Sequence, residues 1–245
     1  MEIVYGFHSV ESLVENSSER IIEVIVGQQR LDQRGKNLIS MLENNQVNYR
    51  TSDKEEIDEY VGDSVHQGVM ALMKPLPQAD ESDLMLHIDG INRPLLILVL
   101  DQIQDPHNLG ACIRTADGAG VDAIIVPKNG ACPVNQTVRK VAAGAVDRVR
   151  AFYVTNLART LDELREKGVW VTGATDKADK NLYESDLVGN VAIVMGSEGK
   201  GLRRLTLEKC DQLASIPMHG SVSSLNVSVA TGVFLFEAAR QRLST

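Results

Sequence analysis

Residues 195–202 read MGSEGKGL and form the stretch of this sequence best suited to bind a small molecule. They follow a short apolar run, so an expected strand opens into a glycine-rich turn. Glycine lets the backbone approach a ligand closely, and Glu198 adds a carboxylate in the middle of the turn. The chemistry to expect here is recognition through backbone groups and one negative charge.

Two nucleotide-binding fingerprints do not fit this turn. The phosphate loop needs Lys followed by Ser or Thr, whereas Lys200 is followed by Gly201. The dinucleotide pattern G-x-G-x-x-G fails as well, and Glu198 would repel a pyrophosphate. A cationic, polyhydroxylated ligand fits better, and S-adenosylmethionine carries a sulfonium, an ammonium and ribose hydroxyls. A turn that only joins a strand to a helix is the structural alternative.

Two further stretches place polar side chains at expected helix starts. Residues 100–127 read LDQIQDPHNLGACIRTADGAGVDAIIVP, with Asn108 as the expected N-cap of a helix. Residues 215–242 read SIPMHGSVSSLNVSVATGVFLFEAARQR, with Ser223 or Ser224 as the expected N-cap of another. In that last helix, apolar residues at helical spacing predict a buried stripe: Val229, Val233 and Phe236.

Strands and helices alternate over residues 93–245. Apolar runs predict strands over 95–100, 121–127, 150–154, 169–175 and 191–196, and amphipathic runs predict helices over 108–120, 135–145 and 156–168. Such alternation predicts an α/β fold with a mainly parallel sheet covered by helices on both faces. Ligands of such sheets bind at the carboxyl ends of the strands, where MGSEGKGL lies.

The front of the chain is organised differently. Residues 1–74 predict a small α/β domain, with helices over 8–17 and 34–45 and strands over 21–27 and 66–74. Residues 75–92 contain four acidic and no basic residues and predict a linker between this domain and residues 93–245. The formal net charge of -8 argues against simple nucleic-acid binding. The acidity belongs to the front, however, because residues 93–245 are close to neutral.

Composition excludes several classes of protein. The longest apolar run, LLILVL, is too short to cross a membrane, and we expect no membrane contact. Cys112, Cys132 and Cys210 lie far apart without the spacing of a metal site, so we expect neither a metal nor a disulfide. The expected setting is a reducing cytoplasm.

Taken together, MGSEGKGL and the two longer stretches resemble the three motifs of the SpoU family of ribose 2'-O-methyltransferases, within the SPOUT superfamily. The stretches YGFHSVESL and VHQGVMALMKP near the front resemble the small, ribosomal-protein-like RNA-binding domain of the same family. The resemblance implies a parallel sheet with a C-terminal trefoil knot, S-adenosylmethionine as methyl donor, and a homodimer. The apolar flank of the last helix formed by Ala230 and Phe234 fits a dimer as well, because it would otherwise meet water.

The resemblance also implies roles for particular residues. The catalytic group comprises Arg114 at its centre, with Asn108, Glu198, Ser224 and Asn226 around it. The cofactor group comprises Gly196, Glu198, Gly199, Ile216, Met218 and Leu225, and no metal is implied. Since a guanidinium stays protonated in proteins, we expect Arg114 to hold a substrate phosphate and to stabilise the developing alkoxide rather than act as a base.

The implied substrate is a guanosine in 23S ribosomal RNA. A transfer RNA is the alternative substrate, and a non-catalytic RNA-binding homologue or another nucleotide-binding enzyme are the alternative functions. The acidic front domain would select the RNA through a local basic face, for which four residues are candidates: Arg20, Arg30, Arg34 and Lys36.

Overall fold

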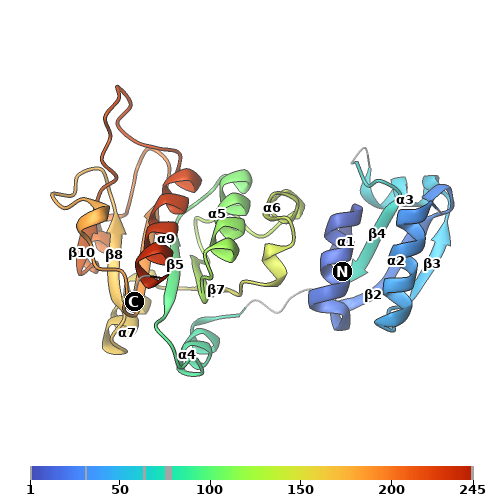
Figure 1. Ribbon diagram of the computed structural model, residues 1–245, viewed down its shortest axis with the longest axis horizontal. Coiled ribbons are helices and arrows are strands. Elements are labelled where there is room, and N and C mark those ends of the chain that lie inside the picture. Colours follow the sequence, from blue (N-terminus) through green and yellow to red (C-terminus); the bar gives the residue numbers. More distant parts are fainter. Residues whose placement is uncertain (1, 31, 63–64, 75–78, 244–245) are drawn as a thin grey trace. The chain divides into compact units, whose positions relative to one another are not determined.

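The computed structural model describes residues 2–30, 32–62, 65–74 and 79–243. The chain divides into two compact units, Met1–Pro77 and Gln78–Thr245, which are coloured blue to cyan and cyan to red in Figure 1. Each unit has its own sheet and its own apolar core.

Unit 1 is a small mixed sheet with helices on both faces. Its elements are β1 (Glu2–Tyr5), α1 (Phe7–Ser17), β2 (Ile21–Gly27), α2 (Gln33–Asn44), β3 (Tyr49–Ser52), α3 (Lys54–Val61) and β4 (Val69–Met73), with short 3-10 turns over Ser18–Arg20 and Gln28–Arg30. The strand order is β1-β4-β2-β3, in which β4 runs antiparallel to both neighbours and β2 pairs in parallel with β3. The two helices and two strands expected here are confirmed, whereas β1, β3 and α3 were not predicted.

Alternation along β2 explains the two cores of unit 1. Val24 and Val26 face α1 and α2, where they pack with residues such as Leu13. Ile25 points to the other face and packs with Ile57 of α3. A strand buried on both faces needs a continuous apolar run, and the second half of β2, VIVG after Glu23, supplies one.

Unit 2 is a parallel sheet of strand order β10-β8-β9-β5-β6-β7. Its strands are β5 (Leu96–Asp101), β6 (Ala123–Pro127), β7 (Ala151–Val154), β8 (Trp170–Ala174), β9 (Val191–Gly196) and β10 (Gln212–Ala214). Its helices are α4 (Glu81–Asp89), α5 (Pro106–Gly118), α6 (Gln136–Ala142), α7 (Leu157–Glu166), α8 (Arg204–Glu208) and α9 (Val227–Leu243), with 3-10 turns over Ala145–Asp147 and Leu182–Glu184. The parallel α/β fold expected from the alternation is confirmed, and the trefoil knot stays a prediction.

Helices cover both faces of this sheet. Alternate residues of β5 point to opposite sides, so Leu98 packs in the core beneath α5, α6 and α9, whereas Val99 packs in the core formed with α4 and α7. In Figure 1 the red helix α9 runs beside the green helix α5 over the former face.

The chain adds strands on both sides of β5, and the direction in which it adds them changes there. The chain moves from β5 outward to β6 and β7, and later returns to place β9 on the other side of β5. The register pairs Asp101 with Gly196, so the carboxyl ends of β5 and β9 lie side by side. This reversal point is the usual ligand position in an open parallel sheet.

The segment expected as a linker is partly helical. Residues 75–78 lie outside the described residues, but Glu81–Asp89 forms α4, and its Leu84 and Ile88 are buried in unit 2. A capping box starts this helix: Asp80 accepts hydrogen bonds from the backbone N–H groups of Ser82 and Asp83, and the Asp83 carboxylate accepts one from the N–H of Asp80. Three of the four acidic residues that suggested a linker, Asp80, Glu81 and Asp83, therefore lie at the start of a helix, and Asp89 ends it.

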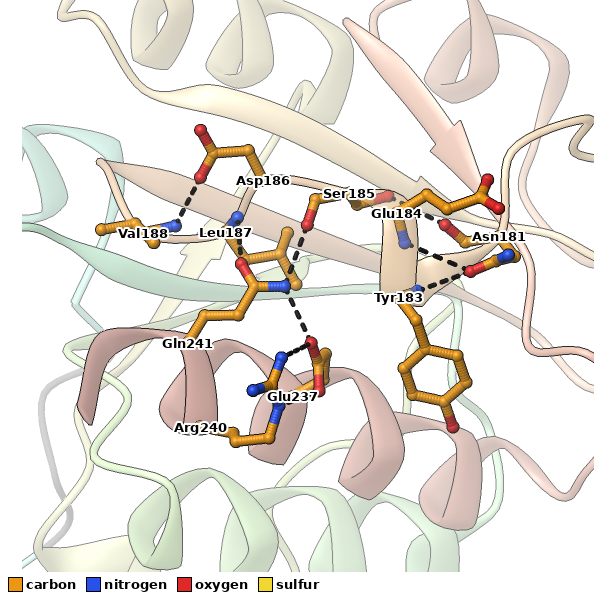
Figure 2. Close-up of polar contacts among 10 residues, drawn as sticks. All are labelled: Asn181, Tyr183, Glu184, Ser185, Asp186, Leu187, Val188, Glu237, Arg240 and Gln241. Carbon is orange, nitrogen blue, oxygen red and sulfur yellow. Dashed lines mark hydrogen bonds and ion pairs between the residues drawn. The ribbon is translucent and has the colours of Figure 1, made fainter. Parts of the chain in front are cut away.

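The second half of α9 is tied to the segment that precedes β9 (Figure 2). The Gln241 side chain donates a hydrogen bond to the carbonyl of Ser185 (2.9 Å) and accepts one from the N–H of Leu187 (2.9 Å). It also donates to the buried carboxylate of Glu237, which Arg240 neutralises. One amide side chain thus satisfies two backbone groups of a segment more than fifty residues away.

Arg242 extends this attachment to the start of the sheet. Its guanidinium donates to the carbonyls of Leu187, Pro94, Leu95 and Gly189 at 2.7–3.1 Å. Burial lowers the pKa of this arginine from its usual value. These bonds and those of Gln241 are called the C-terminal clamp below.

Candidate functional site

The MGSEGKGL turn is a closed loop at the end of β9. Ser197 and Gly201 exchange backbone hydrogen bonds of 3.2 and 2.9 Å across it. Gly199 and Gly201 have positive φ angles of 76° and 68°, which favour glycine. A Cβ at Gly196 would collide with the backbone of Gly201 and Leu202. The glycines are therefore required by the shape of the loop.

A buried carboxylate fixes the far end of this loop. Asp101, at the end of β5, is only 1% exposed. It accepts hydrogen bonds from the backbone N–H of Arg203 (3.2 Å), from the Arg203 Nε (2.7 Å) and from the Thr206 hydroxyl (2.8 Å). The sequence reasoning missed Asp101, although an acidic residue directly after a buried strand is a usable signal.

Three expected catalytic residues meet beside the loop. The Glu198 carboxylate accepts hydrogen bonds from the amide groups of Asn226 (2.7 Å) and Asn108 (3.3 Å). Asn226 also donates to the amide oxygen of Asn108 (2.9 Å). Asn108 lies in the first turn of α5, Glu198 in the loop after β9, and Asn226 directly before α9. We call these three residues the polar triad.

Asn108 is not the N-cap of α5, contrary to expectation. Asp105 is the cap: its Oδ1 accepts from the backbone N–H of Asn108 at 2.8 Å, and Pro106 follows as the first helical residue. Because Asp105 satisfies the start of the helix, the Asn108 side chain is available to the polar triad.

The expected cap of α9 is also wrong. The helix begins at Val227, so Ser223 and Ser224 lie before it. The Oδ1 of Asn226 accepts hydrogen bonds from the N–H (2.9 Å) and the hydroxyl (2.6 Å) of Ser228. Asn226 therefore starts the helix with its oxygen and joins the polar triad with its nitrogen.

The first of two neighbouring cavities opens between the loops after β8, β9 and β10 and the start of α9, and has a volume of about 200 Å³. All the expected cofactor residues line it, as does Ser224. The lining also includes Asp176, which the sequence reasoning missed, and the α9 residues Val227, Ala230 and Phe234.

The second cavity, of about 220 Å³, adjoins the first. The two cavities share Ser197, Glu198 and Val227 as a common wall. The remaining residues of the second cavity are mainly polar: Gln102, Ile103, Gln104, Asp105, Asn108 and Lys200.

Arg114 stands apart from these residues. It is exposed on α5, lines neither cavity, and makes no hydrogen bond or ion pair with the described part of the chain. On the same stretch of α5, Thr115 and Gly118 approach Gly232 and Phe236 of α9. Within one chain, the structure does not bring Arg114 to the polar triad.

The buried face of α9 differs from the expected stripe. Val229 and Phe236 are each 52% exposed, and Val233 is half-buried, whereas Phe234 is 2% exposed and packs in the core. The apolar flank that meets water is thus Val229 and Phe236 rather than Phe234 and Ala230. Its exposure leaves an apolar surface beside α5.

Two of the four residues expected to form a basic face on unit 1 are paired with carboxylates. Arg20 pairs with Glu2 at 3.3 Å, and Arg34 pairs with Glu11 at 3.1 Å while lying over the Phe7 ring. Lys36 makes no ion pair with a described residue, and the side chain of Arg30 lies outside the described part.

In the described ranges, His, Cys, Asp and Glu side chains do not gather in any group able to hold a metal ion. Over the same ranges, every helix is too short or too polar to cross a membrane.

Comparison with known proteins gives the family. Residues 95–236 match the SpoU rRNA Methylase family, and residues 3–79 match the domain described as RNA 2'-O ribose methyltransferase substrate binding. A relative in Escherichia coli K12, named 23S rRNA (guanosine-2'-O-)-methyltransferase RlmB, is 50% identical over 98% of this chain and 99% of its own. A relative of the same name in Photorhabdus laumondii is 51% identical over 99% of each chain.

Solved structures agree with this match. The SpoU methyltransferase AviRb from Streptomyces viridochromogenes, solved with the cofactor AdoMet, superposes with a TM-score of 0.82 over 99% of this chain and 91% of its own. At 22% identity this likeness concerns the fold. The TrmH/SpoU tRNA modifying enzyme of A. aeolicus gives a TM-score of 0.57 at 28% identity, over 67% of this chain and 85% of its own. The matches in sequence, which span both units, show that this protein belongs to the SpoU rRNA methylase family.

Proposed function

We propose that the protein transfers a methyl group from S-adenosylmethionine to the 2'-oxygen of a guanosine in 23S ribosomal RNA. The observation that carries the proposal is the position of Glu198, held by Asn108 and Asn226 in the wall between two cavities. One cavity suits the methyl donor and the other the nucleotide. The substrate is supported by the two relatives named as 23S rRNA guanosine methyltransferases.

The first cavity fits the methyl donor chemically. Ile216, Met218 and Phe234 give it an apolar side for the adenine, and the glycine loop presents backbone groups. Glu198 and Asp176 add negative charge, which favours a sulfonium and an ammonium. We assign cofactor binding to Gly196, Glu198, Gly199, Ile216, Met218 and Leu225. When bound, the cofactor supplies a methyl group attached to a positively charged sulfur.

The polar triad orients the ribose. Both carboxylate oxygens of Glu198 already accept hydrogen bonds, which fixes Glu198 as an acceptor for the 2'-hydroxyl. The ribose oxygen attacks the methyl carbon in line with the breaking carbon–sulfur bond, and the hydroxyl proton leaves to water. Positioning is therefore the main contribution of Asn108, Glu198 and Asn226. Ser224, in the wall of the first cavity, is assigned to the same group.

We further propose that the enzyme is a homodimer joined over the exposed face of α5 and α9. Val229 and Phe236 supply apolar surface, and Arg114 lies outward on the neighbouring helix. A second copy on this face would bring Arg114 of one protomer to the RNA bound by the other, where it holds a phosphate and stabilises the alkoxide. This explains why Arg114 lines neither cavity in the described part of a single chain.

Mixed dimers test this division between protomers. Neither Arg114→Ala nor Asn226→Ala alone should methylate RNA, since each removes part of every site. A mixed dimer of the two variants should regain activity, because one of its sites has both an intact Arg114 and an intact Asn226. Activity that stays absent in mixed dimers, while light scattering shows that the dimers form, would place Arg114 in its own chain's site. Full activity of Arg114→Ala alone would place it outside catalysis. Phe236→Asp should give monomers.

Unit 1 selects the RNA in this proposal, and the setting is the cytoplasm. Since Arg20 and Arg34, two of the four expected cations, are paired with carboxylates, we expect RNA selection by this unit to depend more on shape than on charge. Unit 2 alone (Gln78–Thr245), which keeps α4 in its core, should then bind S-adenosylmethionine yet methylate ribosomal RNA poorly.

Mapping of 2'-O-methylated nucleotides tests the function directly. RNA from cells with and without the gene should differ at one guanosine of 23S ribosomal RNA. An Asn226→Ala copy should fail to restore it, because the polar triad is incomplete. A change confined to transfer RNA would support the alternative substrate, and an unchanged map would support a non-catalytic RNA-binding protein.

A further inference from the structure

We infer that the second cavity holds the guanine base of the target nucleotide and that Asp105 recognises it. This inference rests on the proposed function, because the proposed function places the ribose of the target nucleotide at the polar triad. From that wall the base can extend into the second cavity, since Glu198 and Asn108 line the cavity as well. Asp105 lies in the same lining, three residues before Asn108.

The charges of the cavity favour a base over a phosphate. Two carboxylates, Asp105 and Glu198, line it together with one ammonium group, Lys200. The sum is negative, which opposes a phosphate but favours a neutral ring that presents N–H groups. The side-chain amides of Gln102 and Gln104 add both hydrogen-bond donors and acceptors.

Asp105 has accepting capacity left after it caps α5. Its Oδ1 accepts from the backbone N–H of Asn108, whereas its Oδ2 makes no hydrogen bond with a described residue. A carboxylate offers about four lone-pair positions, so most of them remain open to a ligand. The cap also fixes the Asp105 side chain relative to Asn108 of the polar triad, because Asp105 bonds the backbone N–H of Asn108 in the first turn of α5.

Guanine is the base that matches such an acceptor. Its pairing edge presents two adjacent donors, N1–H and the exocyclic N2 amino group, which can face one carboxylate together. Adenine, cytosine and uracil each present one donor position on that edge. A site built to accept hydrogen bonds discriminates strongly against a ligand that lacks the donor, because the acceptor is then left unpaired.

Gln102, in the lining of the second cavity, has an unusual backbone conformation. Gln102 has a φ of 65°, a left-handed conformation that is uncommon for a residue other than glycine. Its side chain lies against Gly130, where a Cβ would come within 2.7 Å of the Gln102 amide nitrogen. Strained backbone of this kind persists where the surrounding packing holds it, and here it is held beside the proposed base site.

Inosine in place of the target guanosine tests the inference, since inosine lacks only the N2 amino group. The substrate is a 23S ribosomal RNA transcript with guanosine or inosine at the mapped position. For the wild-type enzyme, kcat/KM should be roughly 10- to 100-fold lower with inosine, the range expected for a lost hydrogen bond to a charged acceptor. Asp105→Asn should bring the two values close together, because an asparagine that still caps the helix turns its NH2 group toward the base.

Asn135→Asp is the matched control. Asn135 caps α6 by accepting from the N–H of Val138 at 3.0 Å and lies outside the lining of both cavities, so this exchange should keep the wild-type ratio. Helix content and S-adenosylmethionine affinity should stay unchanged in Asp105→Asn, since Asn and Asp are comparable caps. A wild-type guanosine-to-inosine ratio in Asp105→Asn, or equal rates for the wild type, would overturn the inference. Absence of methylation of either RNA would instead contradict the proposed function.

Discussion

Asp101→Asn should weaken both the stability of unit 2 and its affinity for S-adenosylmethionine. The substitution keeps the size of the side chain but removes its charge and one of its two acceptor oxygens. Three donors depend on that carboxylate: two groups of Arg203 and the hydroxyl of Thr206. At least one of them would then face an NH2 group in a position that is only 1% exposed.

The size of the effect follows from burial. Breaking a buried ion pair costs about 3–5 kcal/mol, but the Arg203 side chain is 43% exposed, so solvent can compensate part of the loss. We therefore expect the free energy of unfolding to fall by about 2–3 kcal/mol. Because Arg203 follows directly on the loop, a weaker anchor should also raise the dissociation constant of the cofactor by about tenfold, equivalent to about 1.4 kcal/mol.

Asp122→Asn is the matched control. The Asp122 side chain is 3% exposed, pairs with Arg93 and accepts from the N–H of Leu96, but it lies at the amino ends of β5 and β6, opposite the strand ends that carry the loop. Urea denaturation should show a similar loss of stability for both variants, whereas calorimetry should show weaker cofactor binding only for Asp101→Asn. Equal affinities in the two variants would refute the claim that Asp101 positions the loop.

Three further predictions concern other parts of the molecule. Hydrogen bonds from Arg50 and the Ser52 hydroxyl lower the pKa of Glu56 from 4.5 to about 2. The ionised Glu56 carboxylate therefore stabilises unit 1 above pH 4.5, and this stabilisation is lost as the pH falls toward 2. Glu56→Gln should remove that part of the acid dependence in a pH series of denaturation curves, and an unchanged dependence would contradict the assignment. Burial raises the pKa of the Cys112 thiol to about 11 and that of the Cys210 thiol to about 12. Both thiols should therefore resist iodoacetamide at pH 8 until urea unfolds the protein. Rapid alkylation of Cys112 or Cys210 in the native enzyme would show that these thiols are accessible. Gln241→Leu should cost about 1–3 kcal/mol in urea denaturation, because it leaves the N–H of Leu187 and the carbonyl of Ser185 unpaired, and a loss below 0.5 kcal/mol would mean that water replaces the side chain.

Sequence patterns located most helices and strands of both units but missed several helix starts. In DPHN, both Asp105 and Asn108 are acceptable caps, and only the preference for proline at the first helical position distinguishes them. The acidic start of α4 resembled a linker because its helix is short and its apolar face consists of few residues, mainly Leu84 and Ile88.

Helix α9 shows a second limit. Apolar residues occur on several sides of it, so spacing alone could not decide between Phe234 and Phe236 as the buried side chain. The choice depends on where α5 and the sheet lie, which is tertiary information.

The polar triad shows the third limit. Asn108 and Asn226 are 118 residues apart, and no local pattern relates residues at such a separation. Resemblance to a family suggested that these residues act together, and the structure shows the hydrogen bonds that join them.

The C-terminal clamp has a consequence for the order in which the enzyme is made. A nascent chain synthesised as far as β10 has every strand of the unit 2 sheet, but it lacks Asn226 and the α9 wall of the first cavity. The clamp then joins Arg242 to Leu95, 147 residues earlier, so this contact can form only after synthesis has passed α9. A ribosome that has not yet synthesised α9 therefore carries a catalytically silent precursor, because the first cavity lacks one wall until then.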